Sequence, residues 1–422
     1  GPGLAPARFA IGDDVCILPG GLDHRGVEVT PLDTRPLADA CAAWKKKGVR
    51  AVACVGKFSP RNAAHELAMA DVVRAAGLTP VCGHSLSGEL NFPRRIATAY
   101  YNAAVARIVD GFLTAVEQSL QAAGIRAPLR LLKADGGAVP AALARQEPVQ
   151  SVLSGPAASV MGILALCPAV AEDACSVLLD VGGTTTDLGM IQNGFPRESS
   201  VAVTIGGVRT NFRMPDVISI GLGGGSIVRV RDDGSVTVGP DSVGYEITKK
   251  ALVFGGDVMT ATDIAVRLGM VELGDKSKVE TISQEVADKA MAAIRALVED
   301  SVDAMKVSNA DVDLILVGGG SIILPEKISG AATVLKPEHF GCANAIGSAI
   351  SKVSGTYEKL MNYDELPREQ SLEKAKNEAI ELAVEAGAVR ETVEIIEMED
   401  VPLAYYPGNT NRVKIKAAGD LN

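Results

Sequence analysis

One stretch, Leu178 to Ile191, limits what this chain can fold into more than any other. It reads Leu-Leu-Asp-Val-Gly-Gly-Thr-Thr-Thr-Asp-Leu-Gly-Met-Ile, which is two apolar strands joined by a Gly-Gly turn. Gly182 and Gly183 let the backbone turn sharply and approach a ligand closely, and the exposed N–H groups of such a turn suit phosphate oxygens. A β-hairpin without a ligand explains the two glycines alone about equally well.

The polar residues around the turn favour phosphate binding. Thr184, Thr185 and Thr186 add hydroxyl donors, and Asp180 and Asp187 flank the turn. Carboxylates repel phosphate, but they hold a divalent cation or orient a water well. We therefore predict Asp180 and Asp187 as metal ligands and catalytic residues, and a phosphate cradle formed by Gly182, Gly183, Thr184 and Thr185.

Two glycine-rich segments follow later in the chain. Asp313 to Pro325 is an apolar strand that runs into three glycines, where a base and ribose can lie against bare backbone. The same letters, Gly-Gly-Gly-Ser-Ile, occur earlier in front of a hairpin with an Asp-Gly turn, so the two copies do not form a repeat. We assign Gly318, Gly319, Gly320 and Ser321 to the nucleoside, and Gly223, Gly224, Gly225 and Ser226 to the phosphate or substrate side. Phe340 to Ser351 then predicts a helix whose small residues allow close packing: Ala343, Ala345, Gly347 and Ala349.

The order of these motifs resembles the phosphate, adenosine and hinge motifs of the actin-like, sugar-kinase and chaperone ATPase superfamily. A narrower resemblance, to the hydantoinase A/oxoprolinase family, covers nearly the whole chain. The blocks that carry it are Pro60–Glu66, Lys133–Gly137, Pro148–Ala158, the Asp180 hairpin, Ile220–Ser226, Val238–Gly244 and Val401–Arg412.

This resemblance implies an α/β fold with actin-like ATPase (ribonuclease H-like) lobes and a small C-terminal α+β appendix. The expected division is 1–150 for the first lobe, 151–355 for the second, nucleotide-binding lobe, and 356–422 for the appendix. The implied cofactors are ATP and Mg²⁺. The implied reaction is ATP-dependent hydrolysis of a cyclic amide, of hydantoin, oxoproline or lactam type, through phosphorylation of its carbonyl oxygen. The implied partner is a B-type subunit or another copy of the chain.

Two other functions remain open at this point. The same family includes ATP-dependent carboxylase subunits that act on ketones, and chaperone-like ATPases suggest a nonenzymatic, nucleotide-gated scaffold or reactivating factor. The chain also departs from the family's pattern. No Asp-x-Gly-Gly-Thr hairpin precedes Asp180, although members begin with one, and the sequence starts Gly-Pro-Gly without Met. We therefore expect a fragment or processed product that is inactive alone.

Further departures concern the substrate side. Asp216–Gly221 lacks a His that long members carry there, and Glu246–Val253 lacks their Pro/Cys/Tyr-rich run. Both differences put the metal-dependent hydantoinase chemistry of the long members in doubt.

Composition bounds the class of protein. The 422 residues are 47% hydrophobic but only 4% aromatic, which is typical of aliphatic α/β cores. The net charge of -10 and the absence of a basic cluster beyond Lys45–Lys47 argue against a nucleic-acid partner. Residues 1–10 do not resemble a signal peptide, and Gly155 to Ala171 is too short for a membrane span, so a buried helix and a cytoplasmic location are expected.

Several single residues complete the predictions. Seven cysteines without a C-x-x-C pair indicate buried thiols and argue against structural zinc. The four histidines lack a triad partner and are interpreted as structural. Asp135, followed by Gly-Gly at a strand end, is a third catalytic candidate, although a turn-forming Asp-Gly is nearly as good an interpretation. Ser154 is expected to be a helix N-cap. Periodicity predicts helices at 37–47, 63–76, 93–123, 283–306 and 368–386, and strands at 49–55, 79–82, 129–133, 391–398 and 411–417.

Overall fold

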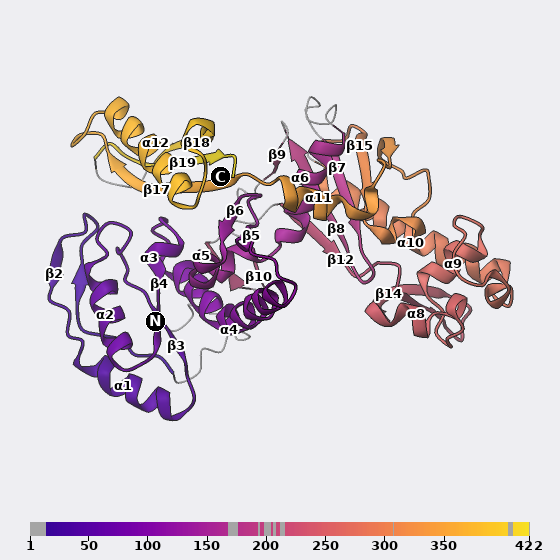
Figure 1. Cartoon of the computed structure of the whole chain (residues 1–422), viewed down its shortest axis with the longest axis horizontal. Coiled ribbons are helices and arrows are strands. Elements are labelled where there is room, and N and C mark those ends of the chain that lie inside the picture. The colour runs from indigo at the N-terminus through magenta and orange to yellow at the C-terminus, as the bar shows by residue number, and fades with distance from the viewer. Residues whose placement is uncertain are drawn as a thin grey trace.

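The computed structural model describes residues 14–167, 176–192, 195–197, 204–205, 208–211, 216–306, 308–403 and 408–421. The start of the chain, Cys175 and part of the predicted ending block lie outside these ranges. The molecule is elongated, with the first and last parts of the chain at one end and the middle part at the other (Figure 1). None of the described helices is both long and apolar enough to cross a membrane.

The N-terminal part consists of β/α units, as predicted. Strands β3 (Ala51–Cys54) and β4 (Thr79–Cys82) pair in parallel. Helix α2 (Ala64–Ala75) connects the two strands, and helix α1 (Arg35–Lys46), which precedes β3, packs in the same core. The apolar face of α1 buries residues 37, 41 and 44, which recur at helical spacing. A short antiparallel pair, β1 (Gly21–Leu22) and β2 (Glu28–Thr30), precedes these units.

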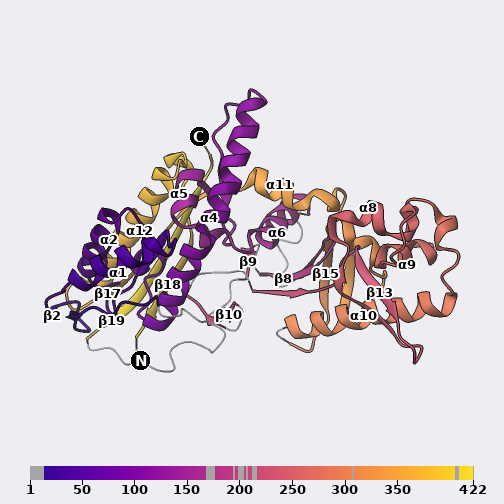
Figure 2. The ribbon, with the colours of Figure 1, turned by 90° about the horizontal axis from the view of Figure 1, so that it is seen from below.

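A long helix follows the short helix α3 (Gly83–Leu86). Helix α4 (Phe92–Ala122) begins at Asn91, whose side chain accepts a hydrogen bond from the Arg94 N–H at 3.3 Å, and Pro93 occupies the first turn as expected. Figure 2 shows the far end of α4 projecting from the body. The chain then returns through β5 (Arg130–Leu132), β6 (Ala138–Pro140), α5 (Ala141–Gln146) and a 3₁₀ turn, η1 (Pro148–Ser151).

A five-stranded sheet joins both ends of the chain. Its order is β18 (Glu394–Pro402), β19 (Thr410–Gly419), β17 (Val353–Asn362), β6, β5. Helix α12 (Arg368–Glu385) packs on β17 and β19 through alanines spaced four residues apart. The sequence did not predict strand β17. The division into three domains stays a prediction, but this sheet takes strands from both the first and the last of the expected segments.

The second sheet carries the Gly-Gly hairpin. Its order is β12 (Val217–Ile220), β8 (Thr186–Gln192), β7 (Ser176–Val181), β15 (Val312–Val317), β16 (Ala331–Leu335), with β9 (Phe195–Pro196) paired to β8. β7 and β8 form the predicted antiparallel hairpin, and β15 lies parallel to β7. The fold class is therefore α/β, as predicted.

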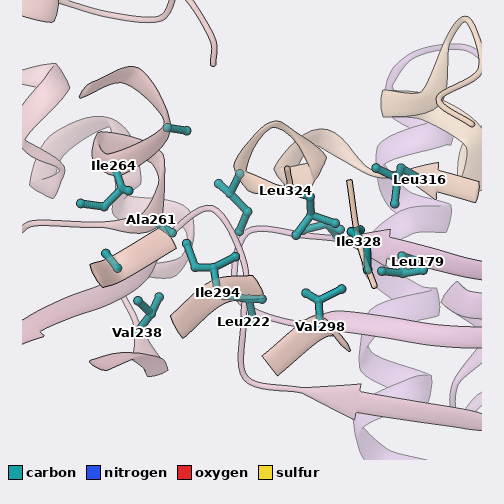
Figure 3. Packing of buried hydrophobic residues seen from close by; sticks show 14 of the residues in the cluster. Leu179, Leu222, Val238, Ala261, Ile264, Ile294, Val298, Leu316, Leu324 and Ile328 are labelled. Atoms are coloured by element: carbon teal, nitrogen blue, oxygen red, sulfur yellow. The ribbon is translucent and has the colours of Figure 1, made fainter. Parts of the chain in front are cut away.

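Both faces of this sheet are covered, which explains why its strands are continuously apolar. Val177 and Leu179 point into a core formed with α10 (Gln284–Met305) and α9 (Ala261–Arg267), whereas Leu178 points to the opposite face. Figure 3 shows the first of these cores, where Ile294 and Val298 of α10 lie among strand and loop residues. The elements around this sheet also include a strand hairpin, β13 (Ser226–Val230) and β14 (Val236–Ser242), and four short helices, η2 (Gly244–Glu246), α8 (Ile247–Lys250), η3 (Leu252–Phe254) and η4 (Lys276–Val279). A two-stranded pair, β10 (Thr204–Ile205) and β11 (Val208–Arg209), lies against α4 instead.

On the face of the sheet opposite α10, two helices pack with their backbones in direct contact. Helix α6 (Ser154–Leu166) meets α11 (Ala343–Ile350), which follows the turn η6 (Phe340–Cys342). A Cβ atom at Gly347 would lie 1.8 Å from the Ala158 carbonyl oxygen, and one at Gly162 would lie 1.9 Å from that of Ala343. The close packing predicted for Gly347 is thus confirmed. The N-cap role predicted for Ser154 is wrong, because Leu153 occupies the cap position with φ 61° and no side chain caps the helix.

We expect Gly347→Ala to destabilise the fold, because its methyl group must push two helix backbones apart. Overpacking of this kind costs about 1–3 kcal/mol, and here no flexible side chain can yield. Gly155→Ala on the same helix pair is the control, since a Cβ there meets nothing within 4 Å, and it should stay within about 1 kcal/mol of the parent. Urea unfolding measures both, and equal stability of the two variants would contradict the packing argument.

Candidate functional site

The tip of the β7–β8 hairpin is the centre of the candidate site. The Gly182 N–H donates to the Thr185 carbonyl at 2.9 Å and closes the turn. The register pairs Asp180 with Asp187, so both carboxylates lie on the same face of the hairpin. Gly183, Thr184 and Thr185 are exposed. Within the described part of the chain, the N–H groups of Gly183 and Thr184 donate to no protein acceptor.

The second glycine segment packs directly against this tip. Val317 pairs with Asp180 in parallel, so Gly318 follows at the carboxyl end of β15, beside the carboxyl end of β7. A Cβ at Gly318 (φ 80°) would lie 2.6 Å from Asp180 Oδ1, and one at Gly320 would lie 2.1 Å from the Gly182 carbonyl oxygen. The structure thus brings the predicted nucleoside segment and the predicted phosphate hairpin together. Residues 319–323 form a 3₁₀ turn, η5 (Gly319–Ile323), instead of continuing the strand to Pro325.

The first Gly-Gly-Gly copy lies behind the hairpin rather than in front of it. Gly223, Gly224, Gly225 and Ser226 are all buried. The Gly224 N–H donates to the Gly182 carbonyl at 3.0 Å, and the Gly225 N–H donates to the Gly183 carbonyl at 2.7 Å. Because these residues are buried and the N–H groups of Gly224 and Gly225 are already engaged, this segment holds the turn in place. The geometry gives no support for its predicted place on the phosphate or substrate side.

Asp180 is held in a fixed orientation that the sequence did not reveal. The Ser159 hydroxyl on α6 donates to Asp180 Oδ2 at 2.5 Å, and Ser159 is itself buried. Burial raises the pKa of Asp180, the Ser159 hydrogen bond lowers it, and the nearby Asp187 carboxylate raises it further, so that the net shift is upward. The only hint in the sequence is that Ser159 directly follows the Pro148–Ala158 block.

Thr186 does not serve as a ligand donor, although the sequence suggested it. Its side chain is fully buried, and its hydroxyl donates to the Leu222 carbonyl at 2.7 Å. The bond ties β8 to the loop before Gly223. This prediction is therefore wrong, because the alternation of the strand turns Thr186 inward while it leaves Thr185 exposed.

The residues at the tip fit a Mg–nucleotide. A Cβ at Gly183 or Gly319 would meet nothing within 4 Å, so both glycines border open space. The Ser321 hydroxyl is buried and finds no partner among the described residues. Two carboxylates, one with a raised pKa because it is partly desolvated, would gain from a divalent cation. Asp180 and Asp187 would hold Mg²⁺, and the N–H groups of Gly183 and Thr184 would face phosphate oxygens.

Asp135 lies in a different environment, in the five-stranded sheet. Its carboxylate contacts Lys133 Nζ at 3.1 Å and Lys416 Nζ at 3.2 Å, and it accepts the Gly137 N–H at 3.0 Å. Burial alone would raise the pKa of Asp135, but the two lysines and the Gly137 N–H hold it well below its usual range. These contacts join β19 to the β5–β6 loop and give no support for a role as base or metal ligand.

We expect Asp135→Asn to lower the free energy of unfolding by about 3–5 kcal/mol at neutral pH, because it leaves two buried ammonium groups without their carboxylate. The folded-state pKa is depressed, so the stabilisation is fully present above the unfolded pKa, begins to fall below about pH 4 and is lost only as the pH falls through the folded-state pKa. The difference from the parent should therefore shrink in acid. Urea unfolding of parent and variant at neutral pH and at a pH below about 4 tests this. Asp232→Asn, at an exposed site, is the control. A pH-independent difference would contradict the ion-pair assignment.

Comparisons with known proteins identify the family and the fold. A family model described as hydantoinase/oxoprolinase N-terminal region matches residues 6–77, and one described as hydantoinase/oxoprolinase matches residues 95–275. The alpha subunit of a caprolactamase from Pseudomonas jessenii is 26% identical over 335 residues, which cover 78% of this chain and 47% of that protein. The chain thus spans about half the length of this relative.

Two solved structures share the fold. The ATP-dependent caprolactamase from Pseudomonas jessenii has a TM-score of 0.76 at 19% identity, over 96% of this chain and 70% of that chain. A nucleotide-free acetone carboxylase has a TM-score of 0.70 at 16% identity, over 96% and 69%. At these identities the likeness establishes the fold alone. The predicted α/β fold class is confirmed, and the likeness to actin-like ATPases stays a prediction.

Proposed function

The chain belongs to the hydantoinase/oxoprolinase family, and on that premise we propose that it is the nucleotide-binding part of an enzyme that hydrolyses a cyclic amide. The observation that carries the proposal is the pairing of Asp180 with Asp187 beside a turn with open N–H groups. ATP, when bound, supplies the phosphoryl group that turns the amide oxygen into a leaving group. An unstrained amide resists water, which is the physical reason for this activation.

The residues of the chain then have separate tasks. Gly183 and Thr184 present N–H donors where charge gathers on the transferring group, and such donors are already oriented by the turn. Asp180 and Asp187 hold the cation that neutralises the same charge. Ser159 fixes Asp180 in one rotamer, and Gly319 leaves room for the nucleoside. The segment from Gly223 to Ser226 acts through the turn that it supports.

A lactam, hydantoin or oxoproline ring is the substrate class that we favour, since a caprolactamase subunit is among the relatives by sequence and by fold. A ketone carboxylase subunit is the second candidate, and the likeness to acetone carboxylase supports it. A nucleotide-gated scaffold would bind ATP without turnover of a small molecule. Because a subunit of a larger enzyme is among the relatives, we expect a partner subunit to be needed.

An assay of the whole protein with its partner subunit separates these candidates. ADP release is measured with a panel of hydantoins, oxoproline and lactams, and then with ketones plus bicarbonate. ADP release that depends on a ring substrate and yields the opened amino acid supports the proposal. Release that requires bicarbonate and a ketone would favour the carboxylase, and nucleotide binding without either turnover would favour the scaffold.

We expect Asp180→Asn to lower ATP turnover of the complete enzyme by roughly 10²–10³-fold, since it removes a cation ligand beside the transferring phosphate. The fold should not suffer. The raised pKa of Asp180 means that its charged form is disfavoured in the folded state, so a neutral Asn should unfold at the same temperature or higher. Thermal unfolding is measured alongside turnover, and unchanged turnover would contradict the assignment.

Gly319→Val should weaken nucleotide binding at least about tenfold, because the branched side chain enters the open space in front of the hairpin. Gly319 does not have a positive φ, so valine there causes no backbone strain. A loss of affinity would therefore come from a clash between the side chain and the nucleotide. Gly111→Val, at an exposed glycine of α4 with equally open space, is the matched control. Calorimetric titration with a nonhydrolysable ATP analogue gives the affinities. An affinity within about twofold of the parent would mean that the segment is a packing feature.

A further inference from the structure

A second group of potential ligands lies far from the hairpin, in the β3–β4 unit. Cys82 is the last residue of β4, His84 follows in α3, and Glu66 lies in the first turn of α2 (Figure 1). The Cys82 Sγ atom, a ring nitrogen of His84 and a carboxylate oxygen of Glu66 all lie within 4.8 Å of one another. The site stands where β3 and β4 end, and ligands of parallel sheets gather at the carboxyl ends of strands.

The structure assigns to these three residues a divalent zinc site with one open coordination position. A thiolate, an imidazole and a carboxylate together suit a borderline-soft ion, and three protein ligands plus water are typical of zinc sites that exchange ligands. Bonds of 2.0–2.3 Å to one Zn²⁺ place ligand atoms about 3–4 Å apart, so small side-chain rotations suffice. Calcium and magnesium prefer oxygen ligands, and this group offers one carboxylate.

The surroundings leave one side of the group accessible. Cys82 and His84 both line a broad cavity of about 2400 Å³, whereas Glu66 is fully buried behind them. Solvent in the cavity can therefore supply the fourth ligand. The same cavity is bordered by the residues that follow β3, Gly56 and Lys57.

Hydrogen bonds fix the orientation of the Glu66 carboxylate. Metal-binding side chains are commonly held in this way by neighbouring groups that do not touch the metal. Its Oε1 atom accepts the Gly56 N–H at 2.8 Å and lies 3.5 Å from Arg95 Nη1, while Oε2 accepts the His84 N–H at 2.8 Å. The remaining contact, 2.7 Å between Oε2 and His84 Nδ1, is the one that a cation would replace. Cys82 Sγ has a weak contact, 3.9 Å from the Glu66 carbonyl oxygen.

Arg95 decides which cation can bind. Its guanidinium is fully buried and holds the carbonyls of Gly56 and Lys57 at 2.8 and 2.7 Å. This fixed positive charge beside Glu66 opposes any second cation. A ligand set that also supplies a thiolate offsets the repulsion, which again favours zinc over a hard ion such as Mg²⁺.

The spacing of cysteines along the sequence does not predict this site, because such patterns consist of several cysteines close together. Here only one cysteine takes part, and the other two ligands differ in type. Residues 66 and 84 come together because α2 packs on β4. The expectation against structural zinc rested on the lack of a C-x-x-C pair, and an open site with a single thiolate does not need such a pair.

Zinc titration of the purified, chelator-treated chain tests the proposal. We expect about one Zn²⁺ per chain in a competition assay with a chromophoric chelator, and an excess of Ca²⁺ or Mg²⁺ should not displace it from this group. Zinc should also raise the unfolding temperature in proportion to its affinity. Failure to bind zinc saturably would overturn the assignment, whatever the outcome of the ATP assays, because it does not rest on the proposed function.

Variants identify the ligands. Cys82→Ala should weaken zinc binding at least about 100-fold, since even outer partners of a metal contribute 10–100-fold. Cys54→Ala is the matched control, because Cys54 is buried and stands opposite Cys82 in the parallel register but outside the group. It should stay within about twofold. Equal weakening in both variants would overturn the site.

Cobalt substitution gives a readout that a fold defect does not imitate. Co²⁺ bound to a thiolate absorbs in the near ultraviolet through charge transfer, so the band should be present in the parent and in Cys54→Ala, and absent in Cys82→Ala. If Cys82→Ala unfolds at a lower temperature without metal, His84→Gln carries the same test, with zinc affinity as the measure. A band that survives Cys82→Ala would show that another cysteine binds the metal and would refute the proposal.

Discussion

The contact between two stretches of bare backbone organises the sheet that carries the Gly-Gly hairpin. Strand β15 lies parallel to β7, and its first residues beyond the strand, Gly318 and Gly320, press against the carbonyls of the hairpin turn. No side chain fits between them, so the end of β15 and the turn take fixed positions relative to each other. The carboxylate of Asp180 lies within this contact, which is why its surroundings are partly desolvated. The nucleotide site that we propose depends on this junction.

Two aspartates illustrate how position changes the meaning of a residue type. Asp135 and Asp180 both precede a glycine-rich turn by sequence, and both were catalytic candidates. Asp135 meets two lysines and a backbone N–H, so its charge is stabilised and contributes to the joining of β19 to β5 and β6. Asp180 meets one hydroxyl and a second carboxylate, so its charged form is disfavoured, and a bound cation would stabilise it. A charge that the fold leaves uncompensated is the better functional candidate.

The glycine motifs divide in the same way. Gly182, Gly183, Gly318 and Gly319 lie at the front of the site, whereas Gly223 to Ser226 support the turn from behind with their N–H groups engaged. Sequence reasoning could find all three segments, because each pairs small residues with an apolar strand. It could not rank them, since a glycine that approaches a ligand and one that approaches another backbone look alike in the sequence. Ser159 and the group of Glu66, Cys82 and His84 had no signal of comparable strength.

The sequence alone determined the family, the α/β class, most helices and the hairpin, because these depend on local periodicity and on glycine's conformational freedom. The tertiary structure decided which polar groups remain available to bind a ligand. It buried Thr186, paired Asp135 with a lysine 281 residues away, and placed Ser159 on Asp180. Such pairings arise from the packing of distant elements, and no spacing rule along the chain records them. The physical reason is that burial and charge compensation are properties of a neighbourhood in space.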